Sequence, residues 1–229
     1  MDAKATAKDL ILPFKILISP FRTFSQLAQK PNAIGLISLS ALVFAVIAAT
    51  LYASAARIDL MINGQRTSFL VTDAFNSWFS NNLAYSLVST LLYWFIFASG
   101  LALLSRILGG KQVSWRVVFP GLAYLLSVFI ILYAVRAVMY FALPSLPFEI
   151  GYWPPVGDTD VSAAVKLMSD TWGPLYVYQF GNYFTLVTFV WLTILGAAAV
   201  KALREISWGK AVAVSAVGFF ITLFLFGPL

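Results

Sequence analysis

The sequence contains neither cysteine nor histidine, and only nine of its 229 residues are acidic. Without cysteine, the chain has no disulfide and no thiolate nucleophile. Without histidine, it lacks a Ser-His pair and the usual zinc and haem ligands. The acidic residues are scattered and form no cluster that would hold a metal ion through carboxylates alone. We therefore expect no cofactor, no metal ion and no enzymatic activity.

Charged residues of either sign are scarce. They make up 10% of the chain, whereas a soluble domain contains roughly 25%, and 61% of the residues are hydrophobic. A chain so poor in charge is expected to be covered mainly by lipid. The formal net charge of +6 then indicates a basic face toward the cytoplasm, and we expect no nucleic-acid partner.

Long apolar runs dominate the chain. A helix needs about 20 mostly apolar residues to cross a bilayer, and five segments reach that length. We predict an all-α, polytopic membrane helix bundle with interfacial amphipathic helices at its N-terminus. The N-terminal segment is 1–32 and the membrane domain is 33–229, with spans at about 33–56, 83–105, 117–143, 180–200 and 211–228 and external loops at 57–82 and 144–179.

The distribution of lysine and arginine predicts the orientation of these spans. Eleven of the fifteen lie before the first span, between the second and third, and between the fourth and fifth. The two other connections contain more acidic than basic residues. Because basic loops stay in the cytoplasm, the N-terminus is predicted to be cytoplasmic and the C-terminus external.

The second external loop has two parts. Prolines and glycines in PSLPFEIGYWPPVGD argue against a regular helix. The stretch DTDVSAAVKLMSDTW that follows has apolar residues on one helical face, and Thr159 or Asp160 can cap it. It predicts a short amphipathic helix that lies on the outer membrane surface or caps the bundle.

The segment KDLILPFKILISPFRTF, Lys8 to Phe24, precedes the first span. Its prolines divide it into apolar runs too short to cross a membrane. Ser19 can cap a helix that starts at Pro20, and Pro31 ends that helix. We expect this segment to contact anionic headgroups or a cytoplasmic protein partner. The candidate membrane-surface contacts are Lys8, Lys15, Pro20, Phe21, Arg22 and Phe24.

Arg136 lies inside the third predicted span, roughly 10 Å from its outer end. A charge at this depth can serve binding or transport, or it can snorkel to the interface or pair with an external carboxylate. Candidate partners are Asp73, Glu149 and Asp170. The sequence leaves both interpretations open.

Spans two and four carry polar side chains that can hydrogen-bond between helices, bond back to their own carbonyls, or line a hydrophilic path. They are Ser86, Ser89, Thr90, Ser99, Asn182, Thr185, Thr188 and Thr193. The first span instead carries small residues at four-residue spacing, which let two helices approach closely. These residues, Ala41, Ala45, Ala49 and Ala53, form either an internal packing face or the seam of a homo-oligomer.

Three regions carry a family resemblance: SPFRTF, GGKQVSWRVVFPGLAYLLSVFIILYAV and VWLTILGAAAVKALREISWGKAVAVSAVGFFITLFL. They resemble the proline-aromatic element, the glycine-rich turn with its following span, and the final helix pair of the Yip domain family, named for interaction with Ypt/Rab GTPases. The family resemblance implies five spans and a role in membrane shaping. Leu12 replaces the glycine of the family's Asp-Leu-x-Gly-Pro motif, so a compact prokaryotic-type member is expected.

Two functions fit these observations. The first is a non-enzymatic membrane protein that organises or shapes the bilayer, or recruits a partner, through a basic cytoplasmic face. The alternative is a small transporter or channel that uses Arg136 and the polar faces of spans two and four. Flux of ions or solutes through vesicles distinguishes them.

Overall fold

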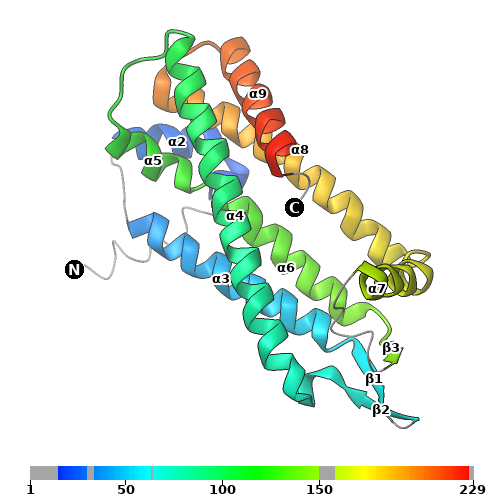
Figure 1. Cartoon of the computed structure of the whole chain (residues 1–229). Coiled ribbons are helices and arrows are strands. Elements are labelled where there is room, and N and C mark those ends of the chain that lie inside the picture. The colour runs from blue at the N-terminus through cyan, green and yellow to red at the C-terminus, as the bar shows by residue number, and fades with distance from the viewer. Residues whose placement is uncertain (1–14, 30–33, 63, 150–157, 227–229) are drawn as a thin grey trace. The chain divides into compact units, whose positions relative to one another are not determined.

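The computed structural model describes residues 15–29, 34–62, 64–149 and 158–226 (Figure 1). Most of these residues are helical, as predicted, and a small sheet is the exception. The helices are α2 (Pro20–Gln29), α3 (Ile34–Ala55), α4 (Asp73–Ile107), α5 (Trp115–Ala123), α6 (Leu126–Ala142), α7 (Asp158–Trp172), α8 (Tyr176–Arg204) and α9 (Trp208–Phe226). The strands are β1 (Ile58–Ile62), β2 (Gln65–Ser68) and β3 (Leu146–Glu149), and η1 (Phe69–Val71) is a short 3-10 helix.

Five helical segments are long and apolar enough to cross a membrane, which confirms the predicted class of multi-pass integral membrane protein. They are Ile37–Ala55, Asp73–Ile107, Trp115–Ala142, Tyr176–Arg204 and Trp208–Leu225. The second extends further than its apolar stretch suggested, because α4 already begins at Asp73, inside the predicted loop 57–82. The helix dipole favours a carboxylate in the first turn, so Asp73 stabilises the N-terminal end of α4 before its apolar stretch begins.

The third span is divided into α5 and α6 by a break at Tyr124 and Leu125. Around the break, Tyr124 N donates to Gly121 O and Leu125 N donates to Leu122 O, which is 3-10 rather than α-helical pairing. The indole N–H of Trp94, on α4, also donates to Leu122 O at 2.9 Å. A side chain that inserts into the hydrogen-bond ladder is a known cause of a helix break. Trp94 therefore supports this interruption from a neighbouring helix.

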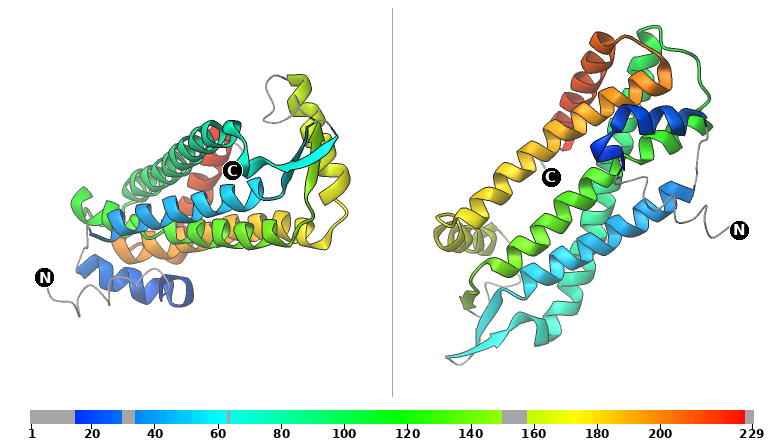
Figure 2. Two further views of the ribbon diagram at one scale, coloured as in Figure 1. Left: turned by 90° about the horizontal axis from the view of Figure 1, so that it is seen from below. Right: turned by 180° about the vertical axis from the view of Figure 1, so that it is seen from behind.

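The described chain divides into two compact units. The first comprises the described residues within 1–43, 88–131 and 187–229. Its interior is formed by the third span, in which residues 121–130 are all buried. Tyr93 packs its ring 5.9 Å from that of Phe129 and 5.9 Å from that of Phe189. Helix α2 packs against α5, and the two lie side by side in Figures 1 and 2.

Helices of the first unit approach one another closely at Gly196 on α8. A Cβ atom at this position would lie 2.5 Å from Ser215 Oγ and 3.0 Å from Phe97 Cζ. Ser215 Oγ in turn donates to Thr193 O at 2.6 Å, joining α9 to α8. Only glycine leaves room for this arrangement of α4, α8 and α9.

The second unit comprises residues 44–87 and 132–186 and contains a three-stranded sheet in the order β2-β1-β3. Strand β1 is antiparallel to β2, with Ile62 opposite Gln65, and parallel to β3, with Ile58 opposite Leu146. The sheet was not predicted. The signal for its hairpin was the Asn-Gly dipeptide between the two strands, since Gly64 has a φ of 78° and such dipeptides favour two-residue hairpin turns.

A hydrophobic core holds the second unit together. Phe69, Phe148 and Trp172 are buried in it, and Trp172 Nε1 donates to Pro144 O at 3.0 Å. The helix predicted from DTDVSAAVKLMSDTW is α7, which contacts β3 and lies beside the sheet (Figure 2). The two predicted external loops thus build a folded, partly β-structured element.

Candidate functional site

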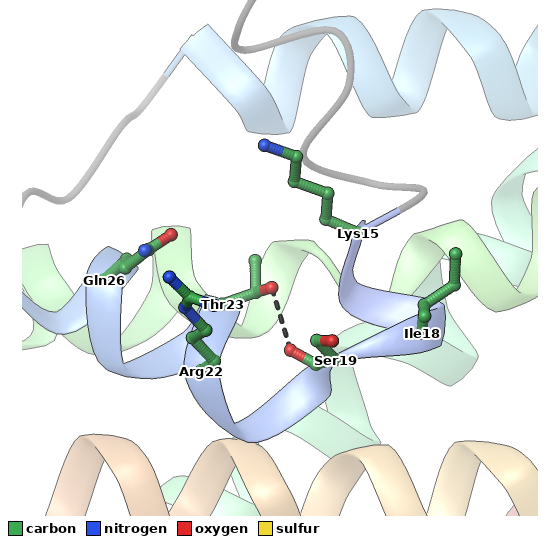
Figure 3. Close-up of a pocket in the computed structure, with 6 residues that line it drawn as sticks. All are labelled: Lys15, Ile18, Ser19, Arg22, Thr23 and Gln26. Carbon is green, nitrogen blue, oxygen red and sulfur yellow. Dashed lines mark hydrogen bonds between the residues drawn. The ribbon is translucent and has the colours of Figure 1, made fainter.

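The predicted membrane-contacting segment is helical over residues 15–18 and in α2. Its exposed side borders a pocket of about 310 Å³. Figure 3 shows Lys15, Arg22 and Gln26 extending toward the same side of the helix, where each brings a nitrogen donor. The complete lining is Lys15, Ile18, Ser19, Arg22, Thr23 and Gln26. Two predicted cations, Lys15 and Arg22, therefore share one polar surface, whereas Lys8 lies outside the described residues.

The opposite side of the same segment is buried in the protein. Ile16 and Phe24 are 0% exposed, and Leu27 is buried with them. Phe24 was predicted to contact the membrane surface, but it packs inside the protein because α2 lies against α5. Phe21 remains 43% exposed and Ile18 85% exposed. The helix is thus attached to the bundle by its apolar face and presents its basic face outward.

Lys201 joins α2 to the α8–α9 turn through two aromatic rings. Its Nζ lies 5.7 Å from the centre of the Phe21 ring and 5.2 Å from that of Trp208, and the two rings are 5.8 Å apart. Both distances are within the range of cation–π attraction. Phe21 is 180 positions before Lys201 in the sequence, so no local pattern indicated its place in this cluster.

The α4–α5 and α8–α9 connections, which carry predicted cytoplasmic cations, are bonded to each other. Lys111 N donates to Arg204 O at 2.9 Å, and Arg204 Nη1 donates to Lys111 O at 2.9 Å. Lys111 Nζ also pairs with Glu205 at 2.6 Å, and Lys210 Nζ donates to Leu108 O at 2.9 Å. These bonds join two parts of the chain that are about 90 residues apart in the sequence.

Arg136, the predicted intramembrane charge, donates from Nη2 to Thr185 Oγ1 at 3.2 Å. Thr185 Oγ1 donates to Gly181 O at 2.9 Å, so α8 holds the acceptor in place. Asp73 and Asp170 are exposed, and the side chain of Glu149 lies outside the described part. The structure therefore joins Arg136 to a polar residue of span four, while its pairing with the three carboxylates stays a prediction.

The other predicted polar and small residues take two kinds of position. Thr90 and Thr188 are buried, and Thr193 Oγ1 donates to Phe189 O in its own helix. Along α3, Ala53 is buried, whereas the other three alanines of the predicted seam are exposed: Ala41, Ala45 and Ala49.

Among the described residues, no group of three acidic side chains could hold a metal ion.

Comparison with protein families gives a match over most of the chain. The family model of the Yip1 domain matches residues 14–228, nearly the whole chain. This match confirms the resemblance found in the proline-aromatic element, the glycine-rich turn and the final helix pair. No curated protein and no solved structure matches the chain.

Proposed function

The chain belongs to the Yip1 domain family, and from this membership we propose that it is a non-enzymatic protein that organises or shapes the membrane through a basic cytoplasmic face. The geometry of α2 carries the proposal. Its apolar face is fixed to α5, and Lys15 and Arg22 remain exposed on the other side. Cations near a membrane surface are attracted to anionic lipids by about 1 kcal/mol each. The same face is available to a cytoplasmic protein partner.

The orientation belongs to this proposal. The cations assigned to this face lie in residues 15–22, in the α4–α5 connection (Lys111) and near the adjoining ends of α8 and α9 (Lys201 and Lys210). Because lysine and arginine are retained on the cytoplasmic side, these three segments are assigned to the cytoplasm. The β1–β2 hairpin and α7 are then external, and the C-terminus is external too.

Reconstituted vesicles test the proposal. We expect the wild-type chain to narrow or tubulate vesicles of phosphatidylcholine mixed with phosphatidylglycerol, observed by electron microscopy, and to leave pure phosphatidylcholine vesicles round. The double variant K15E/R22E should lose this effect, because it reverses the exposed cation of α2 and the exposed cation of the helical residues that precede it. The matched control is R66E/K166E, which changes the charge equally at two exposed cations of the external connections. Equal loss in both variants would contradict the assigned surface.

Transport is the second candidate function, supported by the bond between Arg136 and Thr185. An intramembrane arginine held by a polar side chain is a feature of ion and substrate pathways. The test is release of potassium, chloride or a small sugar from the same vesicles. Transport would replace membrane shaping as the proposed function if the wild type gives flux, Arg136→Ala does not, and neither protein changes the shape of the vesicles.

A further inference from the structure

The first unit contains a second pocket, of about 240 Å³, where the α4–α5 connection meets the end of α8. It is lined by Arg106, Gln112, Val113, Ser114, Trp115 and Arg204. Two of the six residues carry a guanidinium, and none of those lining residues is acidic. Since a water molecule occupies about 30 Å³ in the liquid, the pocket has room for a group several times larger.

Arg204 is fixed before any ligand arrives. It is 3% exposed, and its guanidinium donates to Lys111 O at 2.9 Å, Val113 O at 3.4 Å and Ala102 O at 3.4 Å. Its Nε is buried with no hydrogen-bond partner. Carbonyl oxygens satisfy donors but leave the positive charge uncompensated. The adjacent carboxylate, Glu205, is already paired with Lys111.

The start of α5 adds donors to the same pocket. Ser114 is the N-cap residue, yet its side chain makes no capping hydrogen bond. Its hydroxyl is therefore available to a ligand. The first N–H groups of a helix have no partner inside that helix, and its dipole favours a negative charge there. A guanidinium pair, an uncommitted hydroxyl and a helix N-terminus together favour an oxyanion with several acceptor oxygens.

The pocket also lies at the ends of three membrane-crossing segments. Arg106 is in the last turn of α4, Arg204 ends α8, and Trp115 begins α5. Trp115 is 43% exposed beside the pocket, and tryptophan favours the headgroup layer of a bilayer. We propose that this pocket binds the phosphate group of an anionic lipid headgroup. The proposal rests on the membrane role above and gives it a defined lipid site, separate from the surface of α2.

Native mass spectrometry of the full chain tests the site. The protein is titrated in detergent with short-chain phosphatidic acid, phosphatidylcholine of the same chain length, and inorganic phosphate. Arg106→Gln removes an exposed guanidinium from the pocket, and Arg116→Gln removes that of another exposed arginine, which follows Trp115 in the sequence and does not line the pocket. We expect Arg106→Gln to weaken phosphatidic acid binding about tenfold, because a hydrogen bond to a charged group is lost. Arg116→Gln should leave it unchanged, and Ser114→Ala should give a smaller loss.

Three outcomes would overturn the assignment. Equal weakening by Arg106→Gln and Arg116→Gln would show general surface attraction. Equal binding of phosphatidylcholine would show that the negative headgroup is not recognised. Tight binding of inorganic phosphate that displaces the lipid would assign the pocket to a free anion. Vesicle shape separates the two proposals: if K15E/R22E still tubulates vesicles as the wild type does while Arg106→Gln loses phosphatidic acid, the lipid site stands and the α2 mechanism fails.

Discussion

At the scale of single residues, one packing constraint in the described chain is a missing side chain. Gly196 lets α8 approach Ser215 and Phe97 at distances that leave no space for a methyl group. Both neighbours are held in place, since Ser215 is hydrogen-bonded to Thr193 and Phe97 is fully buried. The small residue is therefore needed for packing rather than for helix formation, which glycine disfavours.

We expect Gly196→Ala to destabilise the protein by about 1–3 kcal/mol, the usual cost of overpacking a core. The measurement is thermal unfolding in detergent, followed by tryptophan fluorescence. Gly209→Ala is the matched control, because a Cβ atom there would meet nothing within 4 Å. An unchanged midpoint for Gly196→Ala would show that Ser215 and Phe97 can move aside.

Arg204 gives a second prediction at this scale. Arg204→Met should destabilise the fold by about 3 kcal/mol or more, because three backbone carbonyls lose their donor and each buried unsatisfied group costs about 1–3 kcal/mol. Lys111→Ala should cost less than about 1 kcal/mol, since its pair with Glu205 is exposed. Chemical unfolding of both variants in mixed micelles makes the comparison. Similar losses would contradict a structural role for the guanidinium.

At the scale of elements, α2 depends on its buried face. Phe24 anchors it among buried residues, whereas Phe21 is partly exposed beside Lys201 and Trp208. The helix has only ten residues, and a helix this short is marginal in isolation. Its order therefore comes from packing on α5.

Phe24→Ala should release α2, because removing a buried phenylalanine ring costs about 3–5 kcal/mol. Hydrogen exchange should show loss of amide protection in residues 20–29, with protection of α4 and α8 retained. Phe21→Ala, at a half-exposed position of the same helix, should change exchange much less. Uniform loss of protection over the whole chain would show that α2 is part of the global fold rather than a docked element.

The elements differ in how far the sequence could predict them. The five spans were predictable because apolar length is a local property. The β1–β2 hairpin had a local signal in its Asn-Gly turn. Strand β3 had none, since its parallel pairing with β1 joins residues more than 80 positions apart. Likewise, the sequence did not distinguish Arg204 from the other cations of the connections. Its buried position depends on the carbonyls of Ala102 and Val113, which are distant in the sequence.

The candidate site on α2 was predictable in part: its basic face was predicted, but the partner of its apolar face was not. Lys15 and Arg22 stand seven positions apart, which places them on one helical face, and the structure keeps both exposed. Phe24 shares the apolar side, but its neighbour is the protein rather than lipid. Sequence periodicity identifies an apolar face and does not identify what covers it.

At the scale of the whole molecule, connections rich in lysine and arginine alternate along the chain with connections that have no excess of basic residues. A reporter enzyme that is active only in the cytoplasm is expected to be active when fused after Lys30 and inactive when fused after Leu229, and a reporter that is active only outside should give the reverse. The reason is the retention of lysine- and arginine-rich segments on the cytoplasmic side. Reporter enzymes that function on only one side of the membrane give the reading. An external signal after Lys30 would reverse the proposed orientation.

The break between α5 and α6 has a mechanical consequence. A load applied to α2 passes directly into α5, because the two helices pack together. After α5, two residues lie outside the α-helices, Tyr124 and Leu125, and α6 begins after them. The third span is therefore interrupted partway along its length, and the indole of Trp94 is hydrogen-bonded to the backbone at the interruption. Because the α-helical hydrogen bonding is interrupted there, the third span can bend more easily at Tyr124 and Leu125 than within α5 or α6.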